Sequence, residues 1–351
     1  MNRVIKDVGF VHLHVHTSFS LREGALTIAK LGKLAAADDQ PALAITDTNN
    51  LFGALEFSEK LSKDGLQPII GVHLTVDFAD AAALGVRGPD IHGLGRGALV
   101  LLAQTEEGYE NLMKLGSKAW LDPEPGDNPH VPLSLVLKHA AGLIALTGGP
   151  TGPLDRALRH ERADIARARL DMLRAAFDKR LYVELQRHDT AEERVVEPLL
   201  IDIAYDAGLP LVATNEPYFP ARSDYEAHDA LLCISDGTLV SAGDRRRLTR
   251  EHRFKTRAEM MELFADIPEA TDNSVEIALR CAYRPLTRKP ICRASRQAVM
   301  RKRRKRRNPK NSRGRRRRGC GSVLPNMGRH PVWRPAIMKS GSISNCPSSR
   351  A

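Results

Sequence analysis

Short apolar runs alternate with longer amphipathic runs through most of this chain, and this alternation limits the fold more than any other feature. Segments with helical spacing, such as Leu26–Ala37 and Ile165–Phe177, separate runs that are typical of buried strands. Alternating strands and helices predict βαβ units and a mainly parallel sheet. The predicted strands are Phe10–Val15, Ala42–Ile45, Pro68–Val76, Ala98–Ala103, Leu143–Leu146, Leu181–Leu185 and Leu211–Ala213. Seven strands favour a barrel-like closure, with the chemistry at the strand C-termini.

The charge of the chain divides it into two unlike parts. Residues 291–351 hold 19 Lys or Arg and no Asp or Glu, whereas residues 1–290 hold 34 Lys or Arg against 42 Asp or Glu. The net charge of +11 therefore describes neither part. We expect an acidic globular body followed by a disordered, basic, low-complexity tail.

Two hypotheses explain the tail. A basic tail would bind nucleic-acid phosphates through counterion release. Alternatively, the segment 291–351 is a Glu-rich stretch translated out of frame, because Glu codons shifted by one base encode Arg or Lys. We favour the out-of-frame hypothesis.

The remaining composition indicates a cytoplasmic protein. No stretch approaches the roughly 20 apolar residues of a membrane span, and the N-terminal "MNRVIKDVGF" lacks the apolar stretch of a secretory signal. The five cysteines form no CxxC pair and suggest no disulfide framework.

The run "HLHVHT" places His12, His14 and His16 at alternate positions. In a strand these three side chains would share one face. Imidazole nitrogens bind zinc or manganese, so the run is a candidate metal site. The alternative is that the histidines only line a polar barrel mouth.

Further polar residues follow other predicted strands. Glu23 is a candidate carboxylate ligand or a residue that favours a helix N-terminus. Asp47 is either a ligand or an N-cap, and for Thr48 the N-cap interpretation is favoured. Weaker candidates for site residues are His73, Glu184, His188, Asn215 and Glu216. Together they put ligand-type residues at several strand ends, where a parallel barrel holds its site.

The order of these motifs resembles a known family. The motifs are "FVHLHVHTSFSLREGAL", "PALAITDTNNLFGALEF", "QPIIGVHLTV", "LVLLAQTEEGYENLMKLGS", "GLIALTGG", "LYVELQRH" and "LVATNEPYF". They resemble the N-terminal PHP (polymerase and histidinol phosphatase) domain of bacterial DNA polymerase III alpha subunits. The resemblance implies a PHP domain over 8–220, with an N-terminal core at about 10–77, and a helical extension over 221–290 toward a palm domain. It also implies a distorted (β/α)7 barrel, of α/β class, with a trinuclear metal site.

The family's metal ligands are only partly present. His14 and His16 match its HxH pair, and Glu23 and Glu216 stand where aspartates are usual. His73 stands where a glutamate is usual. The family's ligands are replaced at Thr48, Ala98, Gly149 and Tyr218. We therefore expect either no metal or one weakly bound divalent ion, zinc or manganese, at His14, His16, Glu23 and Glu216.

The resemblance implies a role in DNA replication. We expect a non-catalytic structural and docking module, because the carboxylates of the polymerase palm would lie beyond residue 351. The implied partners are DNA and other polymerase holoenzyme subunits, including a proofreading subunit and, through regions beyond this chain, the sliding clamp. Two alternatives stay open: a metal-dependent 3′–5′ exonuclease or phosphoesterase, and a nucleic-acid-binding protein that acts through its tail.

Overall fold

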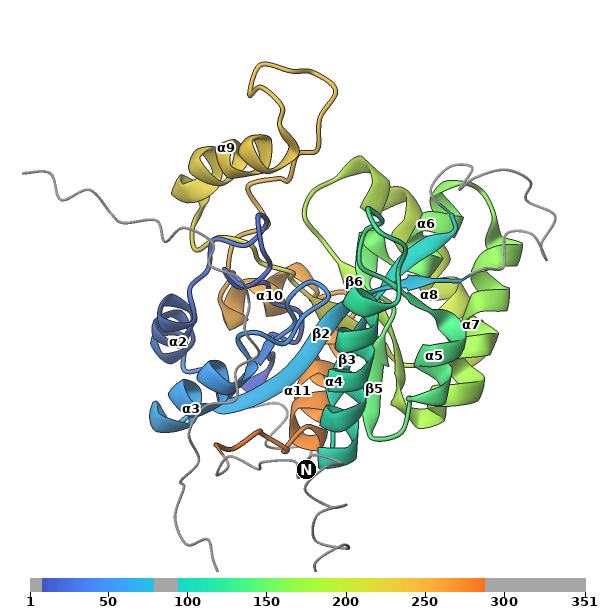
Figure 1. The fold of residues 1–351 in the computed structure, drawn as a ribbon, viewed down its shortest axis with the longest axis horizontal. Helices are drawn as coiled ribbons and strands as arrows, with labels where there is room; N and C mark the ends of the chain where they lie inside the picture. Colours follow the sequence, from blue (N-terminus) through green and yellow to red (C-terminus); the bar gives the residue numbers. More distant parts are fainter. Residues whose placement is uncertain (1–7, 79–93, 288–351) are drawn as a thin grey trace, which may run out of the picture. The chain divides into compact units, whose positions relative to one another are not determined.

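A seven-stranded mixed sheet forms the centre of the computed structural model, which describes residues 8–78 and 94–287 (Figure 1). The strand order is β1-β2-β3-β5-β6-β7, and β4 pairs with β2. The strands are β1 (Ala42–Ile45), β2 (Gln67–Asp77), β3 (Arg96–Ala103), β4 (Val131–Pro132), β5 (Leu143–Leu146), β6 (Leu181–Gln186) and β7 (Leu211–Thr214). The predicted α/β class is confirmed, with a sheet that curls as a half-barrel.

One strand breaks the predicted parallel order. β3 runs antiparallel to both of its neighbours, β2 and β5, whereas β1–β2, β5–β6 and β6–β7 are parallel. The prediction of a mainly parallel sheet missed this reversal because an apolar run has the same composition in either direction.

Helices pack around the sheet; in the view of Figure 1, α2 and α3 lie on the left and α5, α7 and α8 on the right. They are α2 (Ile28–Ala37), α3 (Ala54–Lys63), α4 (Glu106–Leu121), α5 (Leu133–Lys138), α6 (Pro153–Arg159), α7 (Ala163–Phe177), α8 (Ala191–Ala207), α9 (Tyr225–Asp236), α10 (Arg257–Leu263) and α11 (Pro268–Arg280). Threonine side chains cap α2, α4, α8 and α10 at Thr27, Thr105, Thr190 and Thr256. The sequence pattern missed α5 and α6, which are too short to show a helical period.

The two faces of the sheet bury different partners. On β5, Leu143 and Ala145 pack in the cluster that includes α4 and α7, whereas Ile144 and Leu146 pack with Val275 of α11. We call the second face the inner face. Because successive side chains of a strand alternate, the inner face also carries His73 in the middle of β2, Glu184 of β6 and Thr214 at the end of β7. The fold therefore directs these polar groups to one region.

The segment 10–15 is not a strand, and this prediction was wrong. It is extended, and its backbone meets two distant parts of the chain: the Ala44 amide donates to the His12 carbonyl, and the Val11 amide donates to Ser274 Oγ of α11. At its end the His16 amide donates to the Pro217 carbonyl, just after β7. The segment thus lies between β1 and the end of β7 without a regular ladder to either.

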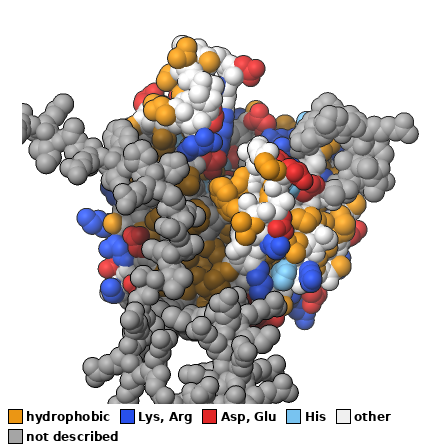
Figure 2. Space-filling model, viewed as in Figure 1, with side chains coloured by type: hydrophobic (Ala, Val, Ile, Leu, Met, Phe, Trp, Pro, Cys, Tyr) orange, Lys and Arg blue, Asp and Glu red, His pale blue; other side chains and the backbone are white. Residues whose placement is uncertain are grey.

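The described surface carries mixed charge. Figure 2 shows Lys and Arg side chains interspersed with Asp and Glu over the described part of the face in view. Within residues 8–78 and 94–287, no helix is long and apolar enough to cross a membrane. The predicted basic tail lies outside the described residues.

Candidate metal centre

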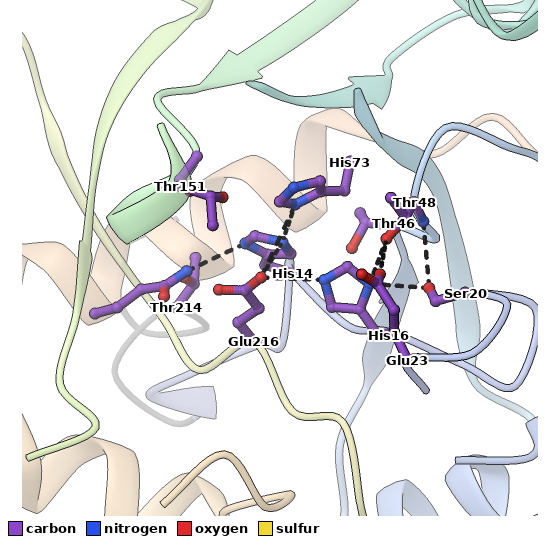
Figure 3. Close-up of polar contacts among 12 residues, drawn as sticks. His14, His16, Ser20, Glu23, Thr46, Thr48, His73, Thr151, Thr214 and Glu216 are labelled. Carbon is purple, nitrogen blue, oxygen red and sulfur yellow. Dashed lines mark hydrogen bonds and ion pairs between the residues drawn. The ribbon is translucent and has the colours of Figure 1, made fainter. Parts of the chain in front are cut away.

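Four buried side chains from three parts of the chain point toward one another (Figure 3). His14 and His16 come from the extended segment, His73 from β2, and Glu216 from the loop after β7. One ligand atom from each lies within 4.8 Å of all the others. We call these residues the four-donor group. It is the only such group of three or more histidine, cysteine or acidic side chains found in the described part of the chain.

The donor spacing suits a single metal ion. His14 Nε2 lies 2.9 Å from His73 Nδ1 and 3.6 Å from Glu216 Oε1, and His16 Nε2 lies 3.2 Å from the same carboxylate oxygen. A tetrahedral zinc site with bonds of about 2.1 Å requires donors about 3.4 Å apart. The group therefore has the donor types and the spacing of one tetrahedral site.

A carboxylate orients the first of these rings. His14 Nδ1 lies 2.7 Å from Oε1 of Glu184 on β6. Glu184 is itself held by the Gly148 amide, at 2.8 Å, and by the Thr214 hydroxyl, at 2.5 Å. Because Nδ1 donates to the carboxylate, Nε2 of His14 is the atom that faces the group. Metal-bound histidines are commonly held in this way.

A hydroxyl orients the second ring. His16 Nδ1 lies 2.9 Å from Ser20 Oγ, which in turn donates to Asp47 Oδ1 at 2.6 Å. Since the serine hydrogen is used by Asp47, the serine oxygen accepts from His16 Nδ1, and His16 Nε2 is left to face the group. Asp47 also accepts from the amide and the hydroxyl of Thr17. Asp47 therefore supports the site from behind and is neither an N-cap nor a member of the group.

The electrostatics of the group favour positive charge between its members. Burial alone would raise the pKa of Glu216, but His14 and His16 hold it well below its usual range. Burial opposes charge on His14 too, yet the carboxylates of Glu216 and Glu184 raise its pKa. Burial, together with the two neighbouring histidines, lowers the pKa of His73 to about 3. These shifts favour positive charge in the space between His14, His73 and Glu216, where a cation would lie.

The predicted ligand Glu23 lies beside the group rather than in it. Its Oε1 accepts from Arg246 at 2.8 Å, and its Oε2 accepts from the Thr48 hydroxyl at 2.8 Å. Thr48 was predicted as an N-cap, which is wrong, because Gly53 occupies that position of α3. Arg246 lies in the loop after α9 and is brought to Glu23 only by the fold.

Tyr218 covers another side of the group. Its ring stacks on His16 with centroids 4.3 Å apart and planes 9° apart, and its hydroxyl donates to Glu216 Oε1 at 2.8 Å. Burial and the Glu216 charge raise the pKa of Tyr218 well above its usual range. The tyrosine is therefore a neutral donor that occupies one lone pair of the carboxylate.

Two other candidate histidines lie apart from the group. His12 does not share a face with His14: its Nε2 donates to the Lys255 carbonyl at 2.8 Å, and its ring packs on Phe254. His188 pairs with Glu193 at 2.7 Å and stacks on His252. The Asn215 side chain bonds to Lys255 and to the Arg253 carbonyl. None of these side chains is a member of the four-donor group.

The sequence interpretation undervalued His73 and missed Ser20 and Arg246. A lone histidine in a strand carries little signal, but its inner-face position follows from the alternation of β2 once the strand is known. Ser20 lies four residues after His16, and a pattern search would have found it only with the loop conformation in hand. No local pattern points to Arg246, because its partner Glu23 is 223 residues away.

The comparisons with known proteins agree with this geometry. The PHP domain model matches residues 12–188. The DNA polymerase III subunit alpha of Caulobacter vibrioides is 46% identical over 284 residues, which cover 81% of this chain and 24% of that protein. The corresponding subunit of Rickettsia prowazekii is 37% identical over 277 residues, which cover 78% of this chain and 22% of that protein. This chain thus spans about a quarter of the length of these curated relatives.

A solved structure shows a weaker likeness. An amidohydrolase from Chromobacterium violaceum, 17% identical, aligns with a TM-score of 0.38 over 59% of this chain and 87% of its own. The family model covers half of the chain, and it includes three members of the four-donor group, His14, His16 and His73. The chain therefore belongs to the PHP domain family and is a homologue of bacterial DNA polymerase III alpha subunits.

Proposed function

We propose that this chain acts as a structural and docking PHP module of a replicative DNA polymerase, with a site for one divalent ion and no nuclease activity. In this proposal the PHP domain spans 8–220, and the segment 221–290 extends it toward the polymerase palm. The observation that carries the proposal is the four-donor group, whose three imidazoles and one carboxylate lie within 4.8 Å.

His14, His16, His73 and Glu216 would hold the ion, and zinc or manganese fits these donors. Such an ion would supply positive charge between the extended segment, β2 and the loop after β7. The protein's own residues fix the donors: Glu184 orients His14, and Ser20 orients His16. We include His73 in this set in place of the sequence-predicted Glu23.

Hydrolysis at a trinuclear centre needs several ions held close together to activate a water and shield a phosphate. Around the four-donor group, both oxygens of Glu23 accept hydrogen bonds from side chains, and Tyr218 occupies a lone pair of Glu216. Thr48 offers a hydroxyl where a histidine ligand would be required. These contacts support one ion and argue against three.

The test uses the full chain, stripped of metal and then loaded with Zn²⁺ or Mn²⁺. We expect about one ion per chain by elemental analysis, a rise in the unfolding temperature on loading, and reversal by a chelator. A His14→Ala, His73→Ala double variant should lose the ion. We also expect no cleavage of 3′-terminated single-stranded DNA in the loaded state. Three ions per chain with chelator-sensitive 3′–5′ cleavage would contradict the structural role and support the exonuclease alternative.

Docking is tested in the replicative complex. The expected partners are DNA, a proofreading subunit and the other holoenzyme subunits, all in the cytoplasm. We expect the loaded chain to be captured by a purified proofreading subunit, and the metal-free chain to be captured less well. Equal failure of both forms would contradict the docking role.

The tail supports a second candidate function, nucleic-acid binding, because 291–351 holds 19 Lys or Arg and no acidic residue. If the tail binds DNA, its deletion should lower both the affinity and the slope of affinity against salt concentration. Unchanged values would remove this candidate. An open reading frame for an acidic polymerase segment past codon 290 would instead support the out-of-frame hypothesis.

A further inference from the structure

A fixed cation lies next to the four-donor group. The Arg246 guanidinium donates to Glu23 Oε1 at 2.8 Å, and the other Glu23 oxygen accepts from Thr48, which lies 3.4 Å from His16 Nδ1. The Arg246 side chain is 41% exposed and that of Glu23 is 23% exposed, so the pair sits at the mouth of the site rather than in its core. An ion that used Glu23 would have to displace both of these contacts.

The loop that carries Arg246 is anchored so that this residue reaches Glu23. The preceding residue, Arg245, makes two hydrogen bonds of 2.6 Å to the carboxylate of Asp229 on α9, and both side chains are buried. On the same helix His228 bonds to the backbone carbonyl of Glu23 at 2.6 Å. The loop after α9 is therefore tied back to α9 by Arg245, while α9 and the loop each contact Glu23, through His228 and Arg246. Arg246 is placed by this framework and does not simply extend into solvent.

The charges around the site match this arrangement. Four carboxylates lie at or behind the group: Glu216, Glu184, Glu23 and, behind Ser20, Asp47. One divalent ion together with Arg246 carries three positive charges, which nearly balances them. Three divalent ions beside Arg246 would carry seven, which four carboxylates in a largely buried site would not offset.

We infer that Arg246 replaces a metal ion at the Glu23 side of the site, so that the chain's own guanidinium limits the site to a single divalent ion. This inference rests on the proposed single-ion site and names the residue that limits the number of bound ions to one. In this inference Glu23 pairs with Arg246 and does not bind a metal ion. Arg246 is a positioning residue, because its fixed positive charge occupies the place of a second cation.

The experiment compares Zn²⁺ binding to the full chain and three variants, by elemental analysis and by competition with a chromophoric chelator. Arg246→Met removes the charge and keeps most of the side-chain length. Arg247→Met removes the same charge one residue on, where the guanidinium donates to the Ala242 carbonyl and does not contact Glu23 within the described residues. Glu23→Gln with Arg246→Met removes both members of the pair. Far-UV circular dichroism checks that each variant is folded.

For Arg246→Met we expect Zn²⁺ to bind about tenfold more tightly, or a second ion to bind, because a nearby positive charge is lost and Glu23 is freed. The Glu23→Gln, Arg246→Met variant should return to the wild-type stoichiometry, and Arg247→Met should match the wild type throughout. If Arg246→Met behaves as Arg247→Met does, the inference is overturned, even when the wild type binds one ion. If Arg246→Met binds Zn²⁺ and the wild type does not, the inference is supported. The proposal that the wild type binds one divalent ion is then contradicted. Absence of binding in all variants would overturn both.

Discussion

The Nδ1 atom of His14 lies 2.7 Å from Oε1 of Glu184, and both side chains are fully buried. This contact fixes which nitrogen of His14 faces His73 and Glu216. Glu184→Gln should therefore weaken zinc binding by about 10- to 100-fold, the usual effect of removing a carboxylate behind a metal-bound histidine. Chelator competition measures the change.

Glu193→Gln is the matched control for that prediction. Glu193 also lies 2.7 Å from Nδ1 of a buried histidine, His188, but this histidine is not in the four-donor group. We expect Glu193→Gln to leave zinc affinity unchanged. Equal losses in the two variants would mean that the Glu184 effect is a general loss of stability.

Acid should destabilise the metal-free chain through its buried neutral histidines. Burial lowers the pKa of His12 to about 4. The unfolded state thus binds more protons than the folded state below the ordinary histidine pKa of about 6.5, and stability falls as the pH drops from about 6.5 toward 4. At pH 5 the His12 share of this loss is about 2 kcal/mol.

Urea unfolding at pH 7 and pH 5 measures this loss. His12→Gln keeps a donor for the Lys255 carbonyl and removes the titrating ring, so it should lose about 2 kcal/mol less than the wild type between the two pH values. A substitution of the exposed His160 to Gln should keep the wild-type loss. The same pH dependence in His12→Gln and wild type would rule out this role of His12.

Removing the Tyr218 hydroxyl should cost stability in the metal-free chain. Tyr218→Phe keeps the stacking on His16 but leaves the buried Glu216 with one hydrogen bond fewer, at a cost of about 1–2 kcal/mol. Tyr205→Phe is the control, because the Tyr205 hydroxyl also donates to a glutamate, Glu269, but on a side chain that is largely exposed. Its cost should be clearly smaller than that of Tyr218→Phe, because water replaces the lost partner at an exposed site. Urea denaturation of both variants decides, and similar costs would contradict the prediction.

Gly148 supports the site through its backbone and should not tolerate a side chain. Its φ is +84°, its amide donates to Glu184, and an added Cβ would collide with the Ala98 carbonyl oxygen. Gly148→Ala should therefore cost at least about 2 kcal/mol and lower zinc affinity. Gly208, at the end of α8, has a similar φ of +62° with open space around it, so Gly208→Ala should cost only about 1 kcal/mol. Thermal unfolding and zinc titration are measured for Gly148→Ala and Gly208→Ala. The difference between the two variants separates the cost of the steric collision from the cost of a positive φ.

Most of the fold could be predicted because the buried strands are runs of apolar residues that can be recognised in the sequence. Six predicted strands lie within one or two residues of observed ones, since short apolar runs such as Leu143–Leu146 are typical of buried strands. The direction of β3 could not be predicted, because strand polarity depends on the chain path and not on local composition. The segment 10–15 was misjudged because its alternation is that of a strand, whereas its amides bond to side chains and isolated carbonyls.

The site was predictable only where a residue carries a local signal, such as a repeated spacing or a place just after a strand. His14 and His16 are two positions apart and identified the extended segment as a ligand source. Glu216 was found from its place after a strand. His73 joined the group only through the inner-face alternation of β2, and Glu23 left it because Arg246, 223 residues away, takes one of its oxygens. Contacts between residues so far apart in the chain produce no periodic pattern in a single sequence.

The extended segment between β1 and the end of β7 has a consequence for the order of events during synthesis. His16 meets Glu216 across a separation of 200 residues. At a translation rate of roughly 5–20 residues per second, His16 waits on the order of 10–40 s before its carboxylate partner is made. Until then the first histidines have no complete binding site and the edge of β1 has no stable cover. The contact between the first histidines and the loop after β7 therefore forms only after most of the described chain has been made.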